Sequence, residues 1–161
     1  MSIDKLWMAP GGLHIEPAQA SDAETCAHLH AQGFYRGWPR EDFAAYIAGR
    51  DTPIYVACDA KRKIAGFAMT RLAADEAELI TIAVDTRWRK KGVGVALMRA
   101  VFADLRLTAA KKLFLEVAAD NPAALRLYGK LGFEKLSERH GYYERADGGK
   151  ATAIVMARDL G

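Results

Sequence analysis

The sequence predicts a single domain of mixed α/β class, in which a twisted mixed sheet is flanked by helices. Segments with the period of strands alternate with segments of helical period, and no repeat, linker or low-complexity run divides them. A chain of 161 residues with 51% hydrophobic and 27% charged residues can bury about 70% of its unfolded surface in one core. We therefore expect one domain over 14–161. Residues 1–13 contain Pro10, Gly11 and Gly12 and show no period, so we treat them as an N-terminal extension.

The first half of the domain is predicted to contain strands and two helices. The run Ser-Asp-Ala-Glu at 21–24 has the pattern of a capping box, and apolar residues then recur at helical spacing up to Phe34. A charged turn at 59–63 joins two apolar segments, which predicts a hairpin. The expected elements are a strand over 13–17, a helix from the capping box to about 34, a short helix over 40–49, and strands over 54–58 and 64–71.

The second half of the domain is predicted to alternate strands with two further helices. Every fourth residue from Val93 to Leu105 is apolar, which gives one face of a helix that can be buried. Asn121 before Pro122 has the pattern of a helix start, and Gly132 has that of a helix end. The expected elements are helices over 93–107 and 122–131 and strands over 78–84, 112–118, 133–143 and 151–158.

The two cysteines and the lack of targeting signals indicate a cytoplasmic protein. Cys26 and Cys58 fall in a predicted helix and a predicted strand, where we expect them to be reduced packing residues. Residues 1–10 lack the basic start and apolar core of a signal peptide, and no run approaches the roughly 20 apolar residues of a membrane span. We expect neither export nor membrane insertion.

The four histidines do not predict a metal site. His28 and His30 are two residues apart and therefore point to different faces of their predicted helix. His14 and His140 have no evident partner with a metal-binding side chain near them. We expect no bound metal.

A cluster of cations and glycines at 87–94 predicts a binding site for a phosphate-bearing ligand. The small excess of positive charge, +3 for the whole chain, is concentrated in Arg87, Arg89, Lys90 and Lys91. The glycines of Gly92-Val93-Gly94 let the backbone approach a ligand closely, and the helix that starts there offers N–H groups without an intrahelical partner. Such a local cluster fits an anion site better than a nucleic-acid stripe. The alternative is an ordinary surface turn with solvated lysines.

Two common phosphate loops agree poorly with this segment. The P-loop of nucleotide triphosphatases needs Gly-x-x-x-x-Gly-Lys followed by Ser or Thr, and the chain has no such string. The dinucleotide fingerprint Gly-x-Gly-x-x-Gly lacks its third glycine, because Leu97 stands at that position. That fold also runs its first strand directly into the glycine turn, whereas residues 85–91 intervene here.

A series of motifs resembles the GNAT acetyltransferase superfamily, densely over about 76–156 and more thinly over 14–75. The motifs are, in order, Ile82-Ala83-Val84-Asp85, Arg89-x-x-Gly92-x-Gly94, Leu113-Phe114-Leu115-Glu116-Val117, Asn121-Pro122-Ala123-Ala124 and Leu127-Tyr128-x-x-Leu131-Gly132-Phe133. Leu-Glu-Val, Asn-x-Ala-Ala, Leu-Tyr and a terminal Tyr142-Tyr143 are similar to the bacterial ribosomal-protein alanine N-acetyltransferases of the RimI type. The resemblance implies the GNAT fold and acetyl-coenzyme A as co-substrate.

The resemblance also implies which residues hold the cofactor. The pyrophosphate of coenzyme A would lie on the glycine loop, and the pantetheine arm would pair with the strand before it, where that strand splays from the strand of Glu116. The implied cofactor-binding residues are Ile82, Ala83, Val84, Arg89, Lys90, Lys91, Gly92, Val93, Gly94, Val95 and Asn121.

Two residues carry the chemistry that the resemblance implies, and each also has a structural explanation. Glu116 interrupts an apolar strand, so it is either a solvent-exposed strand glutamate or the proton acceptor for the attacking amine. Tyr128 is either an aromatic packing residue or the group that protonates the departing thiolate. Attack of the amine on the thioester would be direct, without an acyl-enzyme, and we assign neither cysteine a nucleophilic role.

The expected reaction is acetylation of a protein N-terminal α-amine, with an N-terminal alanine of a ribosomal protein as acceptor. Two aromatic groups, Phe34, Tyr35 and Trp38 on one side and Tyr142 and Tyr143 on the other, would border the peptide entry or else serve as hydrophobic closure. One alternative is acetylation of a small-molecule amine on the same scaffold. An alternative of another class is a non-catalytic module that binds RNA or the ribosome surface; beyond that alternative we expect no direct nucleic-acid binding and no membrane partner.

Overall fold

The computed structural model describes residues 6–34, 36–144 and 146–161, without the side chains of 142–144. Its helices are α1 (Ala23–Gly33), α2 (Arg40–Ala48), α3 (Val93–Leu105) and α4 (Pro122–Lys130), with short 3-10 turns η1 (Ala20–Asp22) and η2 (Thr86–Trp88). The strands are β1 (Trp7–Met8), β2 (His14–Pro17), β3 (Ile54–Cys58), β4 (Ile64–Ala73), β5 (Glu76–Val84), β6 (Lys112–Ala118), β7 (Glu134–Glu144) and β8 (Lys150–Asp159).

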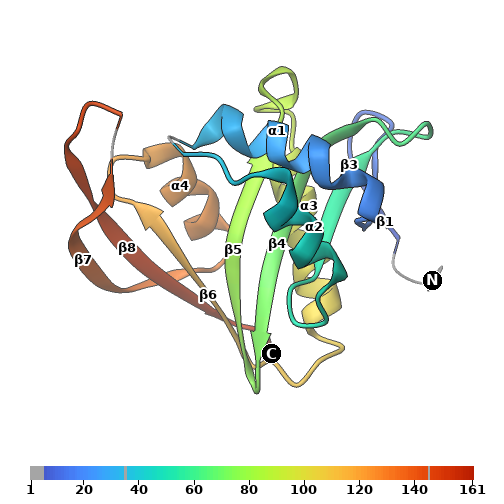
Figure 1. Cartoon of the computed structure of the whole chain (residues 1–161). Coiled ribbons are helices and arrows are strands. Elements are labelled where there is room, and N and C mark those ends of the chain that lie inside the picture. Colours follow the sequence, from blue (N-terminus) through green and yellow to red (C-terminus); the bar gives the residue numbers. More distant parts are fainter. Residues whose placement is uncertain (1–5, 35, 145) are drawn as a thin grey trace.

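Within the described residues, the strands form one eight-stranded sheet in the order β1-β2-β3-β4-β5-β6-β8-β7. Neighbouring strands are antiparallel except β5 and β6, which are parallel. The helices lie on both faces: α1 and α2 lie in front of the sheet in Figure 1, and α3 lies behind it. A mixed sheet with helices on both faces is the architecture that the resemblance to the GNAT superfamily implies.

Each face of the sheet has its own hydrophobic core. The larger core contains the buried stripe of α3, residues of β6 and Tyr128 of α4. The smaller core lies under α1 and α2 and includes Cys26, Phe43 and Phe67. Alternation along β6 divides its side chains between these faces, because Leu113, Leu115 and Val117 belong to the α3 core and the residues between them point the other way.

The parallel strands β5 and β6 pair only near their beginnings. The register joins Glu76 to Lys112, Ala77 to Leu113 and Glu78 to Phe114. Among the described residues, 79–84 of β5 and 115–118 of β6 continue without pairing to each other, and the two ribbons diverge toward the top of Figure 1. The sequence predicted this separation of the two strands. Beyond Glu78, the backbone groups of β5 that face β6 therefore have no hydrogen-bonding partner in β6.

An irregularity in β5 lies at the start of its unpaired segment. Met69 of β4 pairs with Thr81 and Thr70 pairs with Leu79, so Ile80 is an extra residue on β5. A bulge of this kind bends a strand and changes the direction of the side chains that follow. Leu79 belongs to the α3 core, whereas Ala83 belongs to the core under α1 and α2.

Most predicted elements are confirmed, and the main differences lie near the N-terminus. The predicted position of the capping box was wrong. The upstream backbone N–H, that of Gln19, donates to Asp22 at 2.7 Å and not to Glu24, and the turn η1 precedes α1. In the segment assigned to the extension, Trp7–Met8 pairs with β2 and Leu13 is buried. The domain boundary at residue 14 stays a prediction.

Candidate active site

The candidate active site is the opening between β5 and β6, with the glycine loop at one end of it. Gly92 has a φ of +85° and forms the N-cap of α3, a conformation that glycine adopts without steric cost. The first helical hydrogen bond at this end runs from the N–H of Ala96 to the carbonyl of Gly92 at 3.1 Å. The N–H groups of Val93, Gly94 and Val95 therefore precede the helical ladder and can bind an anion.

The cations of the 87–91 cluster differ in their availability. Arg87 is bound to Asp85, with 3.1 Å between its Nη2 and the carboxylate Oδ2, and its backbone N–H donates to Oδ1 at 2.9 Å. These hydrogen bonds lower the pKa of the buried Asp85 below its ordinary value. Arg87 thus closes the turn after β5 although its side chain is 71% exposed, and Arg89, Lys90 and Lys91 are exposed as well.

Arg89 lies at the junction of β5 and α1. Its Nε donates to the carbonyl of Val84 at 3.3 Å, and its Nη2 would lie 3.6 Å from a Cβ on Gly33 at the end of α1. Arg89 therefore holds the end of β5 in this structure. Its predicted contact with pyrophosphate stays a prediction.

The N-terminal segment supports the glycine loop, which the sequence did not predict. Gly11 has a φ of +70°, and a Cβ there would lie 2.8 Å from Cζ3 of Trp88. A Cβ on Gly92 would lie 3.3 Å from Cγ of Pro10. The Nζ of Lys91 also lies over the Trp88 ring, 5.5 Å from its centroid. The only signal in the sequence was the pair of glycines after Pro10, which we interpreted as a loose extension.

Glu116 points away from the α3 core, toward the face that carries α1 and α2. Its position between Leu115 and Val117 on β6 fixes this direction, and its side chain keeps 20% of its surface exposed. Arg139 of β7 forms an ion pair with it, with 3.2 Å between Nη1 and Oε1. The sequence did not predict this partner, because Arg139 is on a strand that reaches β6 only through β8.

Tyr128 and Asn121 both belong to α4. Tyr128 is buried in the α3 core with 6% of its surface exposed, and its ring meets that of Phe133 edge-on at 5.6 Å. Asn121 caps the helix, because its Oδ1 accepts from the N–H of Ala124 at 3.2 Å. Leu127 approaches the glycine loop, since its Cδ2 would be 3.9 Å from a Cβ on Gly94. The start of α3 and this helix therefore lie side by side.

A buried histidine organises the predicted acceptor loop. His30 of α1 stacks against Phe34 at 4.2 Å and against Trp38 at 4.5 Å between ring centroids, and its Nδ1 accepts from the backbone N–H of Trp38 at 3.2 Å. Burial lowers the pKa of His30 to about 4, so the ring is neutral at pH 7. The sequence placed His30 on the buried stripe but did not predict this role. Tyr35 and the side chains of Tyr142 and Tyr143 lie outside the described residues.

One argument from the sequence about metals is wrong. His14 does have neighbours with metal-binding side chains, because Glu16 and Cys58 lie beside it. The sequence could not reveal this group, since Cys58 is far from His14 along the chain and reaches it only through pairing of β2 with β3. The expectation that the protein binds no metal stays a prediction.

The chain belongs to the acetyltransferase (GNAT) family, whose family model matches residues 23–133. The fold and the family define it as an acetyl-CoA-dependent N-acetyltransferase. The alternative of a non-catalytic RNA-binding module is therefore not supported. No helix in the described part of the chain is long and apolar enough to cross a membrane.

Characterised relatives cover nearly the whole chain. The [ribosomal protein bS18]-alanine N-acetyltransferase of Escherichia coli (strain K12) is 33% identical over 143 residues, which are 89% of this chain and 95% of the relative. The N-alpha-acetyltransferase RimI of Mycobacterium tuberculosis is 35% identical over 147 residues, 88% of this chain and 89% of the relative. The crystal structure of the Escherichia coli ribosomal-protein-S18-alanine N-acetyltransferase superposes with a TM-score of 0.84 at 31% identity, covering 92% of this chain and 94% of that one.

Proposed function

We propose that the protein transfers acetyl from acetyl-coenzyme A to the N-terminal α-amino group of a protein, and that its acceptor is a ribosomal protein with N-terminal alanine. The observation that carries this proposal is the similarity to the bS18-alanine N-acetyltransferase of Escherichia coli, which spans both sides of the β5–β6 opening. An α-amino group has a pKa of about 8, against about 10.4 for lysine, so one carboxylate suffices as its base.

The cofactor in this proposal lies along β5 and the start of α3. The pantetheine arm pairs with backbone groups of Ile82, Ala83 and Val84, which β6 leaves unpaired. The pyrophosphate takes the N–H groups that begin α3, together with the charges of Arg89, Lys90 and Lys91. Asn121 uses its Nδ2 for the cofactor, because its Oδ1 is engaged in capping α4.

The proposed chemistry uses one residue from each face of the sheet. Glu116 faces the α1 and α2 side and takes a proton from the acceptor amine, whose nitrogen attacks the thioester carbonyl carbon. The carbon–sulfur bond breaks, and Tyr128, which belongs to the α3 core, gives its hydroxyl proton to the leaving thiolate. The reacting thioester then sits in the opening between these residues. The division of the two side chains between opposite faces supports this assignment.

The ion pair of Arg139 with Glu116 affects how the acceptor amine reaches this carboxylate. Its guanidinium holds one oxygen of Glu116 before the acceptor enters, at 3.2 Å. An incoming ammonium group carries the same charge and can replace Arg139 at the carboxylate. In this proposal the acceptor displaces Arg139 and then loses its proton to Glu116.

A panel of acceptors tests the proposed specificity. The purified protein is assayed with acetyl-coenzyme A and with a peptide of the bS18 N-terminal sequence, the same peptide with N-terminal alanine changed to methionine or blocked, and small amines such as spermidine. We expect the highest kcat/KM for the unblocked alanine peptide and no turnover of the blocked one. Preference for a small amine would refute the assignment of the acceptor and leave the acetyltransferase activity intact.

A further inference from the structure

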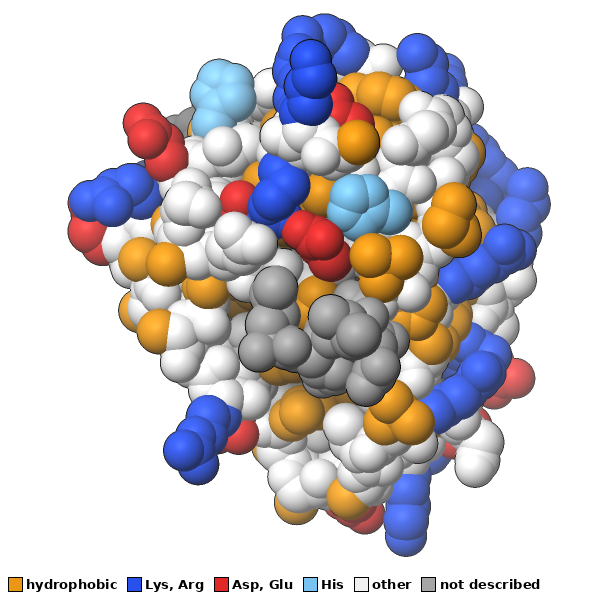
Figure 2. All heavy atoms as spheres, turned by 90° about the vertical axis from the view of Figure 1, so that its right-hand side faces the viewer, with side chains coloured by type: hydrophobic (Ala, Val, Ile, Leu, Met, Phe, Trp, Pro, Cys, Tyr) orange, Lys and Arg blue, Asp and Glu red, His pale blue; other side chains and the backbone are white. Residues whose placement is uncertain are grey.

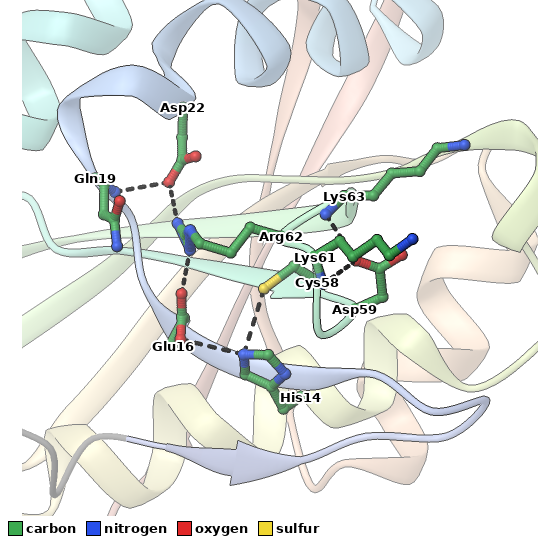
Figure 3. Close-up of polar contacts among 9 residues, drawn as sticks. All are labelled: His14, Glu16, Gln19, Asp22, Cys58, Asp59, Lys61, Arg62 and Lys63. Carbon is green, nitrogen blue, oxygen red and sulfur yellow. Dashed lines mark hydrogen bonds and ion pairs between the residues drawn. The ribbon is translucent and has the colours of Figure 1, made fainter.

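Three potential metal ligands lie together at the β2 edge of the sheet, away from the β5–β6 opening. His14 and Glu16 are two residues apart on β2, so they share one face. Cys58 of β3 is the direct cross-strand partner of His14. Figure 3 shows the three side chains pointing toward one another above the two strands. We call these residues the triad.

The distances within the triad agree with a shared ion. The Sγ of Cys58 lies 3.5 Å from Nε2 of His14, and Oε2 of Glu16 lies 3.1 Å from the same nitrogen. All the ligand atoms lie within 4.8 Å of one another. A tetrahedral zinc ion with ordinary bond lengths separates sulfur from nitrogen by about 3.6 Å and nitrogen from oxygen by about 3.4 Å. The triad therefore needs only small adjustments to surround an ion.

A hydrogen bond from Nε2 of His14 can serve the Glu16 carboxylate well and the Cys58 sulfur only weakly, because sulfur is a weak acceptor. Nε2 of His14 faces both the thiol and the carboxylate, but a neutral imidazole nitrogen is either a donor or an acceptor. If Nε2 donates to Glu16, the thiol proton finds no lone pair on the imidazole. If Nε2 accepts from Cys58, its lone pair also faces the carboxylate oxygen, which is unfavourable. A cation at the centre takes a lone pair from each of the three atoms.

Arg62 holds the carboxylate in the orientation that the ion requires. One of its Nη atoms donates to Oε1 of Glu16 and the other to Oδ2 of Asp22, at 2.6 Å. Oε2 of Glu16 is thereby left toward His14, as expected for a carboxylate ligand fixed by a hydrogen-bond donor behind it. Glu16 and Asp22 carry two negative charges against one on Arg62. The excess of negative charge favours a cation.

We propose that His14, Glu16 and Cys58 bind a zinc ion, with a solvent molecule as the fourth ligand. Thiolate and imidazole ligands suit Zn²⁺, whereas Mg²⁺ and Ca²⁺ require oxygen ligands. His14 and Glu16 each keep 22% of their side-chain surface exposed, which gives the ion a path from solvent. Figure 2 shows this side of the molecule, where histidine, acidic and basic side chains lie together at the surface.

Binding must release a proton from Cys58. Burial raises the pKa of this thiol to about 11, so it is protonated at pH 7 before the ion arrives. Zinc replaces that proton, which passes to solvent as the sulfur–metal bond forms. The bound ion connects β2 to β3 and, through Arg62 and Asp22, to the start of α1. It acts on stability and does not depend on the proposed acceptor.

Zinc binding by the full-length protein tests the proposal. The chelator-treated protein is dialysed against ZnCl₂ and analysed for metal content, and thermal unfolding is followed with and without zinc. We expect one zinc per chain, a higher Tm with zinc, and no rise with Mg²⁺. Co²⁺ as a probe is expected to give a thiolate-to-metal charge-transfer band.

Variants separate the triad from adventitious binding. Cys58→Ser and Glu16→Gln are expected to lower zinc affinity at least tenfold and Cys58→Ser to abolish the cobalt band. Cys26→Ser, which changes a cysteine that is also buried but lies outside the triad, is the matched control and should bind as the wild type does. Circular dichroism checks that each variant is folded. If Cys58→Ser does not fold, Glu16→Gln tests the triad instead. Wild-type protein without bound zinc, or equal affinity in folded triad variants, would overturn the proposal.

Discussion

The two sides of the β5–β6 opening are built in different ways. The proposed cofactor side consists mainly of backbone from segments close in sequence, namely the end of β5, the glycine loop and the start of α3. The proposed acceptor side consists of side chains from distant segments: the stack of His30 with Phe34 and Trp38, and Glu116 with Arg139. A backbone site depends on local conformation, whereas a side-chain site depends on packing. Substitutions on the two sides should therefore change different kinetic constants.

The largest effects are expected where the two sides meet. Glu116→Gln removes the proposed base and Tyr128→Phe removes the proposed acid, and each should lower kcat by about 10²- to 10⁴-fold, because general acid–base catalysis is worth this much. Acetyl-coenzyme A binding, measured by calorimetry, should persist in both variants. Glu78→Gln, which changes an exposed glutamate at the paired end of β5, is the control. An unchanged kcat for either variant would remove that residue from the mechanism.

His30 should make the acceptor side sensitive to acid. Its pKa is about 4 in the folded protein and about 6.5 in the unfolded chain, so the unfolded state binds the proton first as pH falls. The stability that the neutral ring contributes is complete above pH 6.5 and decreases from there to pH 4, by about 3 kcal/mol.

Urea unfolding of the wild type and of His30→Gln measures this contribution. We expect the difference in free energy of unfolding between the two proteins to shrink from pH 7 to pH 4.5, and the KM for the acceptor to rise in the variant while that for acetyl-coenzyme A is kept. The exposed His28 on the same helix provides the control, His28→Gln. A pH-independent difference would show that His30 does not titrate in this way.

The cofactor side should depend on the backbone of Gly92. Gly92→Ala puts a side chain on a residue with a φ of +85°, which costs about 1–3 kcal/mol, and places its Cβ against Pro10. We expect the KM for acetyl-coenzyme A to rise about tenfold with the acceptor KM unchanged. Gly148→Ala is the matched control, because Gly148 has the same φ of +85° and a Cβ there would meet nothing within 4 Å. An equal KM for acetyl-coenzyme A in Gly92→Ala and Gly148→Ala would contradict the role of Gly92.

The smallest expected effect concerns the support of the loop by the N-terminal segment. Gly11→Ala would displace Trp88, and we expect a rise of about threefold in the KM for acetyl-coenzyme A, which corresponds to a loss of roughly 0.7 kcal/mol. Gly12→Ala is the control, since Gly12 also has a positive φ, +78°, but a Cβ there has no neighbour within 4 Å. If Gly11→Ala and Gly12→Ala have the same KM for acetyl-coenzyme A, the contact of Gly11 with Trp88 does not support cofactor binding.

The backbone conformation of the proposed cofactor side was largely predictable from the sequence. Glycines at 92 and 94, the cap at Asn121 and the end at Gly132 each constrain the backbone within a few residues, so their effect can be inferred locally. Alternation along β6 likewise predicts that Glu116 stands out from an apolar strand. The acceptor side was less predictable, because neither Arg139 nor the stack around His30 follows from neighbours in sequence.

The sequence by itself determined the order of elements, the glycine loop and the family, since these depend on local backbone preferences and on motifs in a fixed order. Only the tertiary structure decided which side chains meet. Strand register brings Cys58 beside His14, and packing brings Gly11 against Trp88. The physical reason is that backbone conformation is set by neighbours along the chain, whereas contacts between distant side chains are set by the folding of the whole sheet.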